Sequence, residues 1–212
     1  MKHGFFITFE GVEGCGKSTQ VSLLKTYLGS LGRDVVALRE PGGTMLGEAV
    51  RPILVNSSKE PIDPWAELFL YEACRAQLVK NVIRPALLKE GTIVICDRFI
   101  DSTIAYQGYG RGLDLEDIAD MNFLATGGLV PDLTILLDVD AEAGLKRASA
   151  RMDSAGGLRE DRFEKEAVEF HRKVRQGFLE LACVYPRFAL VDGQREIPSI
   201  HKEICGIIND KV

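Results

Sequence analysis

A glycine-rich string near the N-terminus, GVEGCGKS from Gly11 to Ser18, limits most strongly how this chain can fold. It matches the pattern G-x-x-x-x-G-K-[ST] in full, and it lies between an apolar run at Phe5–Glu10 and a helical pattern at Lys17–Leu31. In that setting the N–H groups of the loop and the start of the helix surround phosphate oxygens. The string therefore predicts a loop that binds nucleotide phosphates; the alternative is a glycine-rich turn with a surface lysine.

The positions of this loop have separate expected roles. Lys17 is expected to reach the β- and γ-phosphates and to act in catalysis, and the Ser18 hydroxyl is expected to bind Mg²⁺. The other residues expected to bind the nucleotide are Gly11, Gly14, Cys15, Gly16 and Thr19. Because Cys15 lies beside a helix N-terminus and a lysine, it is also a candidate reactive thiol. A small residue that fits the turn is the alternative there.

Short apolar runs alternate with helical patterns along the rest of the chain, which predicts an α/β fold. We expect a roughly five-stranded parallel sheet flanked by helices on both faces, because such strands are nearly continuous in apolar residues. The expected strands are Phe5–Glu10, Val35–Arg39, Thr92–Cys96, Leu133–Asp138 and Phe188–Val191. The expected helices after the first are Pro64–Glu90, kinked or divided at Pro85, Leu115–Ala125, Ala141–Arg151, Glu164–Cys183 and Pro198–Ile208.

The composition fits one globular domain spanning residues 1–212. The chain is 46% hydrophobic and 27% charged, and its net charge of −5 argues against broad nucleic-acid binding. Five cysteines without a C-x-x-C pair suit the cytoplasm, and we find neither a signal-peptide core nor a run long enough to cross a membrane. Residues 151–162 (RMDSAGGLREDR) are polar, glycine-containing and rich in arginine, as expected of a mobile lid.

Charged side chains stand where two expected strands end. Arg39 ends the second strand, and Asp97 and Arg98 follow the third. Ligands of parallel sheets bind beyond these ends, so both arginines should point into one crevice, where their planar forks suit a phosphate. Asp97 is expected to bind Mg²⁺, directly or through water. The alternatives are arginines that only cap the strand ends and an aspartate that is their structural partner.

Five further strings carry a resemblance to a known family. They are REPGGT at 39–44, DRF at 97–99, STIAYQG at 102–108, PDL at 131–133 and DRFE at 161–164. With the phosphate loop, they make the chain resemble the thymidylate kinases of the bacterial type, nearly from end to end. The resemblance implies phosphoryl transfer from ATP to dTMP, giving dTDP and ADP, with Mg²⁺ as cofactor. The family is usually dimeric, so the resemblance also implies a homodimer.

The resemblance implies that nine residues form the site for the acceptor dTMP. One of them, Arg98, is also expected to be catalytic. Arg39 and Arg98 would hold the monophosphate, and Tyr71 would stack on the base, although phenylalanine is more usual there. The remaining implied contacts are Arg75, Thr103 and Gln107 with the base edge, Tyr106 with the ribose 2′ position, Pro41 with the sugar, and Glu13 near the sugar and metal, in a catalytic role. By themselves these residues also fit ordinary packing, turn and capping roles.

The variable positions of the phosphate loop hold no arginine, so the resemblance implies the type whose catalytic arginine lies in the lid. Arg151 is the first candidate and Arg159 the second, with Arg159 also counted among the ATP-binding residues. Arg147 and Gly193-Gln194 are expected to contact adenine. A solvated basic loop is the alternative for the lid.

Two other functions remain open at this point. One is a kinase for another pyrimidine monophosphate, such as UMP or CMP. The match of Thr103, Tyr106 and Gln107 to the thymidylate kinase pattern argues against it. The other is a regulatory ATPase without any nucleotide acceptor, which would turn over ATP whether or not a monophosphate is present.

Overall fold

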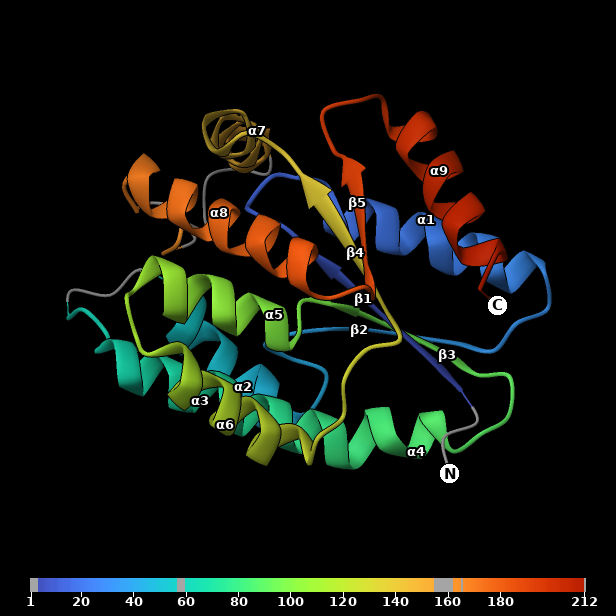
Figure 1. The fold of residues 1–212 in the computed structure, drawn as a ribbon, viewed down its shortest axis with the longest axis horizontal. Coiled ribbons are helices and arrows are strands. Elements are labelled where there is room, and N and C mark those ends of the chain that lie inside the picture. Colours follow the sequence, from blue (N-terminus) through green and yellow to red (C-terminus); the bar gives the residue numbers. More distant parts are fainter. Residues whose placement is uncertain (1–3, 57–59, 155–161, 165, 212) are drawn as a thin grey trace.

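The computed structural model describes residues 4–56, 60–154, 162–164 and 166–211, without the side chains of 151–154. Its centre is a five-stranded sheet in the order β2-β3-β1-β4-β5, with every strand parallel to its neighbours (Figure 1). The strands are β1 (Phe5–Glu10), β2 (Val35–Arg39), β3 (Ile93–Asp97), β4 (Leu133–Asp138) and β5 (Phe188–Asp192). The predicted fold class is thereby confirmed.

The sheet register brings the charged strand ends together. Arg39 on β2 pairs with Asp97 on β3, and Asp97 pairs with Phe9 on β1, directly before Glu10 and the phosphate loop. Strand β3 ends at Asp97, one residue later than expected, so the carboxylate is part of the ladder. Parallel strands end on the same side, and this edge of the sheet therefore collects the candidate ligand-binding residues.

Helices cover both faces of the sheet. On one face, α1 (Lys17–Ser30) packs against the first three strands and against α9 (Ile197–Asn209), which also contacts β5 (Figure 1). On the other, α8 (Val168–Val184) packs on β4, β5 and the π-helical segment η2 (Ile104–Gly110). This double cover explains why the middle of β1, β3 and β4 is buried throughout. Within the described residues, no helix has the length and apolarity needed to span a membrane.

The long helix expected from Pro64 to Glu90 is divided. It consists of α3 (Pro64–Leu78), a π-helical turn η1 (Val79–Ile83) and the short α4 (Arg84–Leu87). Pro85 stands at the start of α4, where a missing N–H removes the regular bond to the turn before it. The wider π turn ahead of the proline accommodates this loss. The division was expected at Pro85 itself and lies in the turn before it.

Four helices differ from or add to the expected pattern. Helix α2 (Met45–Val55), capped by the Thr44 hydroxyl, and the short α5 (Ile100–Thr103) that leads into η2 were not predicted. Helix α8 begins at Val168, four residues later than expected, while α6 (Leu115–Thr126) is close to its expected span. Helix α7 (Ala141–Ser154) runs past Arg151, so the first residues of the expected lid are helical.

Candidate active site

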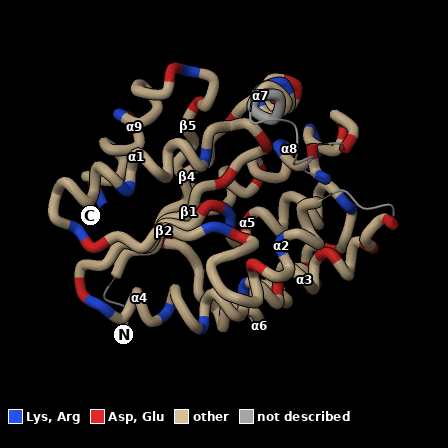
Figure 2. Tube along the Cα trace, turned by 180° about the vertical axis from the view of Figure 1, so that it is seen from behind, with Lys and Arg blue, Asp and Glu red and all other residues tan. Residues whose placement is uncertain are grey.

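A cleft open to solvent, with about 1050 Å³ of empty space, lies beyond the ends of β1, β2 and β3. Basic and acidic positions meet here, as Figure 2 shows where β1 ends near α5. The predicted site residues that line the cleft are Glu13, Gly14, Gly16, Lys17, Ser18, Thr19, Arg39, Pro41, Tyr71, Arg75, Asp97, Arg98, Thr103, Tyr106 and Gln107. Glu40, Arg51, Val55, Ser102, Phe163 and Glu164 line it without having been predicted.

The phosphate loop has the backbone that its glycines allow. Gly11, Gly14 and Gly16 all have positive φ, and α7 approaches so closely that a Cβ on Gly14 would lie 2.0 Å from the carbonyl oxygen of Gly144. Lys17 folds back over the loop and donates to the carbonyl oxygens of Gly11 and Val12, both at 2.9 Å. Its ammonium group is thereby held within the loop, where the phosphates of a nucleotide would lie.

Two hard oxygen ligands meet beside the loop. The Ser18 hydroxyl at the start of α1 donates to Oδ2 of Asp97 at the end of β3, over 2.8 Å. A hydroxyl and one carboxylate suit Mg²⁺, which usually keeps several waters and takes its other ligands from phosphates. The donor set therefore fits the metal that the sequence predicts at these two residues.

Arg98 has an unusual backbone and a crowded side chain. Its φ of 74° is in the left-handed region, and its guanidinium lies over the ring of Tyr106 at 4.7 Å. Nη1 donates to the Gly11 carbonyl (3.3 Å) and Ser102 Oγ (3.1 Å), and Nη2 to Glu13 Oε1 (3.1 Å) and the Tyr106 hydroxyl (3.0 Å). Nε–H has no partner among the described residues, and it remains as a donor for a ligand in the cleft.

Glu13 is buried and ionised within the loop. Its Oε1 accepts from Arg98 and, at 2.5 Å, from the Tyr106 hydroxyl, while Oε2 lies 3.0 Å from Nδ1 of His171. Burial by itself raises the pKa of Glu13, but His171, Arg98 and Lys17 outweigh it and lower the pKa to about 2. With 9% of its surface exposed, Glu13 is not a solvated loop residue.

Of the two arginines expected to hold the monophosphate, Arg39 is more exposed than Arg98. Its Nη2 pairs with Glu48 of α2 at 3.0 Å, and Glu48 also accepts from the N–H of Gly43 at 2.9 Å. Arg51 of α2 donates to the carbonyl oxygen of Pro41 at 2.7 Å and lines the same wall. Without the unpredicted α2, sequence reasoning had no means of finding Arg51 in the site.

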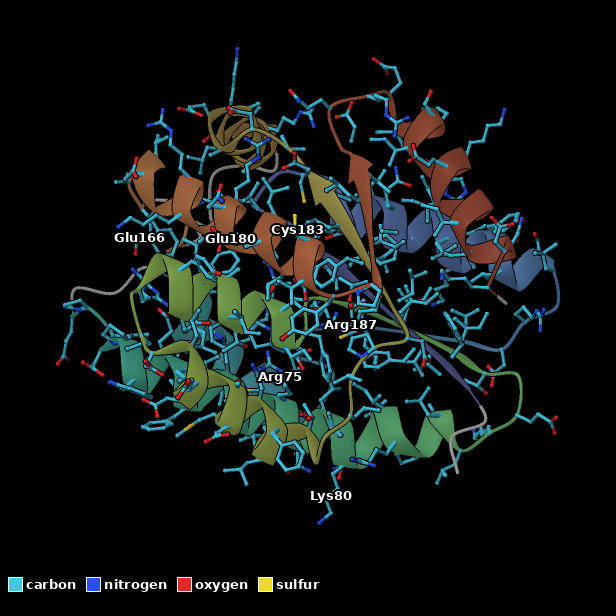
Figure 3. All side chains as sticks on the ribbon, in the orientation of Figure 1. Arg75, Lys80, Glu166, Glu180, Cys183 and Arg187 are labelled. Atoms are coloured by element: carbon cyan, nitrogen blue, oxygen red, sulfur yellow. The ribbon has the colours of Figure 1, made fainter. Side chains whose placement is uncertain are left out.

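The structure revises the expected setting of Tyr71 and Arg75. Both were expected to contact the base, yet Tyr71 packs against the hydrophobic core and Arg75 is 1% exposed. In Figure 3, Arg75 lies among interior side chains, whereas Lys80 on η1 points outward. All five N–H groups of Arg75 are used, by Glu40, Glu72, the Asn122 side chain and the Phe99 carbonyl oxygen. Burial raises the pKa of Glu40 to about 7, although Arg75 acts to lower it.

Two polar side chains in the cleft wall, Thr103 and Gln107, differ in their hydrogen bonds. The Thr103 hydroxyl is buried and has no hydrogen-bond partner among the described residues. Gln107 donates its amide N–H to Glu67 Oε1 at 2.5 Å, which leaves its amide oxygen to face a ligand. A buried hydroxyl without a hydrogen bond is unfavourable unless a ligand supplies one. Thr103 therefore indicates where a polar group of a ligand would bind in the cleft.

A buried carboxylate, Glu67 of α3, connects the cleft wall to Arg162 at the end of the expected lid. It accepts from Gln107, Arg111 and Arg162, and Arg162 also donates to the Leu54 carbonyl oxygen at 3.1 Å. The Phe163 ring lies between the guanidinium groups of Arg111 (5.6 Å) and Arg162 (4.6 Å). Phe163 and Glu164 belong to the string DRFE that carried the resemblance, which was the available signal for them.

Some predicted residues do not line the cleft. Gly11 and Cys15 are buried residues of the phosphate loop, and the burial of Cys15 favours a fitted small residue over a reactive thiol. Arg147 of α7 donates to the carbonyl oxygens of Gly193 (2.8 Å) and Gln194 (3.4 Å), so the three expected adenine contacts do lie together. Arg159, most of the expected lid and the side chain of Arg151 lie outside the described residues.

The buried Glu10 supports the loop that carries Arg98, and its ionisation gives a prediction about stability. Glu10 accepts from the Phe99 N–H (2.8 Å) and the Ser102 hydroxyl (2.6 Å). Burial, together with the charge of Asp101, raises its pKa above the ordinary value of 4.5. Above that pH the folded chain therefore holds a proton that the unfolded chain has lost, and stability falls as pH rises. We expect the Glu10→Gln variant to gain stability relative to the parent between pH 5 and pH 8.

Urea unfolding at the two pH values tests this. Glu90→Gln serves as control, because Glu90 is exposed and its effect should not change with pH. A difference between the Glu10→Gln variant and the parent that is constant with pH would show that Glu10 ionises freely in the fold.

Comparison with known proteins agrees with this geometry. The sequence profile of the family described as thymidylate kinase matches residues 9–204. A thymidylate kinase from Geobacter sp. (strain M21) is 53% identical over 195 residues, which are 92% of this chain and 86% of the relative. One from Geotalea uraniireducens (strain Rf4) is 51% identical over 206 residues, 97% and 96% of the two chains. The crystal structure of thymidylate kinase from Ehrlichia chaffeensis superposes with a TM-score of 0.75 at 37% identity, covering 97% of this chain and 98% of that one.

Proposed function

This chain belongs to the thymidylate kinase family, and from that premise we propose how its residues transfer a phosphoryl group from ATP to dTMP. The reaction gives ADP and dTDP. One observation carries the proposal: Lys17 and Arg98 both donate to the carbonyl oxygen of Gly11, at 2.9 and 3.3 Å. The cation of the ATP side and the cation of the acceptor side therefore stand next to each other, where two phosphate groups would meet.

On the ATP side, the phosphate loop holds the nucleotide. The N–H groups of Gly14, Gly16 and Lys17 surround the phosphates, and the Lys17 ammonium group moves from its two carbonyl partners to the β- and γ-phosphates. Ser18 and Asp97 hold Mg²⁺, which neutralises phosphate charge when it is bound. Arg147 with Gly193-Gln194 contacts the adenine side. The whole of 1–212 acts as one kinase domain in this proposal.

On the acceptor side, two arginines hold the monophosphate of dTMP. Arg98 uses the Nε–H that no described residue takes, and Arg39, half exposed and held by Glu48, reaches it from β2. The ring of Tyr106 and the turn at Pro41 border the sugar. Arg151 or Arg159 of the lid stabilises the negative charge on the phosphoryl group during its transfer.

The edge of the base binds two polar groups of the cleft wall that have hydrogen-bonding capacity left, the Thr103 hydroxyl and the Gln107 amide oxygen. Thymine offers a donor at N3–H and an acceptor at O4, and the Gln107 amide oxygen and the Thr103 hydroxyl supply the complements. Tyr71 stacks on the ring. Cytosine has the opposite donor and acceptor pattern at these two atoms, so it fits this wall less well. Arg75 supports the wall, since its N–H groups are all engaged.

The test is ADP formation from Mg-ATP with dTMP, dUMP, UMP, CMP, AMP and GMP offered separately. We expect strong stimulation by dTMP, weaker stimulation by dUMP and little by the ribonucleotides. Preference for another monophosphate would reject the proposed wall, and ATP turnover that ignores every acceptor would indicate a regulatory ATPase.

Thr103 allows a sharper prediction, because its hydroxyl has opposite effects on stability and on binding. The Thr103→Val variant removes a buried hydroxyl without a partner among the described residues, so stability should rise by up to about 1 kcal/mol. The same change removes a hydrogen bond to thymine, so KM for dTMP should rise about three- to tenfold. Urea unfolding and steady-state kinetics measure the two effects.

Thr126 provides the matched control. It is equally buried, but its hydroxyl donates to the Asn122 carbonyl oxygen at 2.8 Å and lies away from the cleft. The Thr126→Val variant should therefore lose stability and keep the KM for dTMP. An unchanged KM in the Thr103→Val variant would remove Thr103 from the base site.

We further propose that the chain acts as a homodimer in the cytoplasm. Helices α2, α3 and α6 pack side by side and carry the exposed apolar side chains of Ile53, Phe69, Phe123 and Leu124. A neighbouring copy that covers this face would remove them from water. Light scattering should give the mass of two chains; the mass of one would contradict the dimer. The five free thiols suit a reducing compartment.

A further inference from the structure

Behind the cleft wall, Glu67 on the first turn of α3 holds the amide group of Gln107. Glu67 has no exposed surface and is not among the described residues that line the cleft, whereas Gln107 is. Its Oε1 accepts a hydrogen bond from the amide nitrogen Nε2 of Gln107 at 2.5 Å. The contact therefore connects a side chain that faces a ligand to one that a ligand does not touch.

Two arginines determine what Glu67 offers to Gln107. Arg111 donates through Nη2 to Oε2 at 3.3 Å and through Nε to Oε1 at 3.4 Å, and Arg162 donates to Oε2 as well. A carboxylate that is paired with two guanidinium groups accepts hydrogen bonds and donates none. The opposite orientation of the Gln107 amide would set its oxygen against Oε1, with no proton between the two acceptors. Glu67 therefore fixes the amide with its nitrogen toward α3, and the amide oxygen is left for the cleft.

This orientation matters because the other polar group of the wall does not discriminate. The Thr103 hydroxyl has no hydrogen-bond partner among the described residues, and a hydroxyl rotates to suit its partner. It donates to O4 of thymine or uracil, and it accepts equally well from the N4 amino group of cytosine. The Gln107 amide oxygen accepts from N3–H of thymine or uracil, but it meets only a lone pair at N3 of cytosine. Discrimination between these bases therefore depends on which way the Gln107 amide points.

We propose that Glu67 is a positioning residue that sets the base specificity of the acceptor site. By fixing the Gln107 amide, it makes the site bind bases that carry a proton on N3, thymine and uracil, and reject cytosine. The inference rests on the proposed function for the place of the base. The orientation of the amide is a property of the chain alone, and it does not depend on turnover.

The Glu67→Gln variant should turn the Gln107 amide around. Arg111 and Arg162 both donate at the Oε2 side, so the new amide keeps its oxygen there and places its NH₂ group where Oε1 was. Gln107 then turns its oxygen toward this NH₂ group and its own NH₂ group toward the cleft. An NH₂ group in that place suits N3 of cytosine and conflicts with N3–H of uracil. The preference should therefore shift from uracil toward cytosine.

The first test compares kcat/KM for dUMP and dCMP, which have the same sugar and phosphate and differ only at the 3–4 edge of the base. In the Glu67→Gln variant the ratio of kcat/KM for dUMP to that for dCMP should fall at least about tenfold. The kcat/KM for dTMP should fall with that for dUMP, and KM for ATP should stay nearly unchanged. An unchanged ratio, or an equal loss for both nucleotides, would overturn the proposal.

Two variants control for damage to the surrounding cluster. Glu166 pairs with Arg111 at 2.6 Å but makes no hydrogen bond to Gln107, so the Glu166→Gln variant should keep the ratio of the parent. The Gln107→Met variant removes the amide itself. In that background Glu67→Gln should not change the ratio further, and a further change would show that Glu67 acts by another route.

The second test needs no substrate, because it follows hydrogen exchange of the Gln107 side chain in protein labelled with ¹⁵N-glutamine. The chain has five glutamines, and Gln107→Met identifies the signals of Gln107. We expect slow exchange of its NH₂ group in the parent, and fast exchange in the Glu67→Gln variant, where the group faces the cleft. Gln176, which is exposed and donates to Glu180 at 2.9 Å, gives the fast reference. Exchange in the parent as fast as that of Gln176 would overturn the proposal.

The two tests separate this inference from the proposed function. A parent protein that phosphorylates dCMP as readily as dUMP, or that responds to no monophosphate, would reject the proposed base site, while hydrogen exchange still decides whether Glu67 holds the amide. A parent that prefers dUMP, together with a Glu67→Gln variant that keeps this preference, would reject the role of Glu67 alone.

Discussion

Replacement of Arg98 by alanine should lower kcat/KM for dTMP by about 10³-fold, because it removes one of the two cations that lie where the two phosphates would meet. The guanidinium lies between the phosphate loop and the acceptor wall, bonded to the Gly11 carbonyl on one side and to Tyr106 and Ser102 on the other. Binding of ATP depends on the loop and Lys17, so its dissociation constant should change little. Single-turnover kinetics and ATP titration measure the two effects.

Two further substitutions of Arg98 distinguish the effect of its charge from the effects of its planar shape and of its strained backbone. The Arg98→Lys variant keeps the charge but loses the planar guanidinium group. Its kcat/KM for dTMP should therefore lie between that of the parent and that of the alanine variant. The Arg98→Gly variant should be as inactive as the alanine variant but about 1 kcal/mol more stable, because the φ of 74° suits glycine. Activity of the alanine variant within a few-fold of the parent would exclude Arg98 from phosphate binding.

Replacement of Arg75 by methionine should destabilise the chain by about 3–5 kcal/mol, since it strands two buried carboxylates. The side chains of Arg75 and Glu40 are 1% and 3% exposed, their closest atoms are 2.7 Å apart, and Glu72 is 8% exposed. The loss is a large part of the roughly 5–15 kcal/mol by which a domain is usually stable. Urea unfolding followed by circular dichroism measures it.

The Arg195→Met variant is the control for this loss. Arg195 pairs with Glu203 on the surface, where the two side chains are 40% and 38% exposed, so its replacement should change stability by less than about 1 kcal/mol. Adding Glu40→Gln to the Arg75→Met variant should recover part of the stability, because one stranded carboxylate becomes neutral. A loss below about 1 kcal/mol for Arg75→Met would show that the contacts of Arg75 with Glu40 and Glu72 do not stabilise the fold.

The strands and the phosphate loop were the most predictable parts of this chain. Each is a short continuous run, so its apolar residues or its glycines identify it without knowledge of any distant segment. Strands β1, β2 and β4 have the bounds expected from the sequence. The π-helical turns η1 and η2 and the helix α2 were not predicted, because Pro52 inside α2 and the glycines of η2 weaken the helical pattern.

The partners of the charged residues were beyond sequence reasoning. Arg75 was expected at the base, and the structure shows it bonded to Glu40, which is 35 residues away. The Glu13 carboxylate in the phosphate loop meets His171 of α8, and no local pattern connects the two. Such pairs form only when helices from distant parts of the chain pack over the same edge of the sheet.

The sequence alone determined the phosphate loop, the parallel sheet and the strand ends that carry Arg39, Asp97 and Arg98, because each depends on neighbouring residues. The tertiary structure alone decided which charges are buried and paired. It buried Arg75 in the lining of the cleft, left the Thr103 hydroxyl without a partner among the described residues, and set His171 against Glu13. The physical reason is that burial and charge pairing depend on three-dimensional proximity, which the packing of helices on the sheet creates.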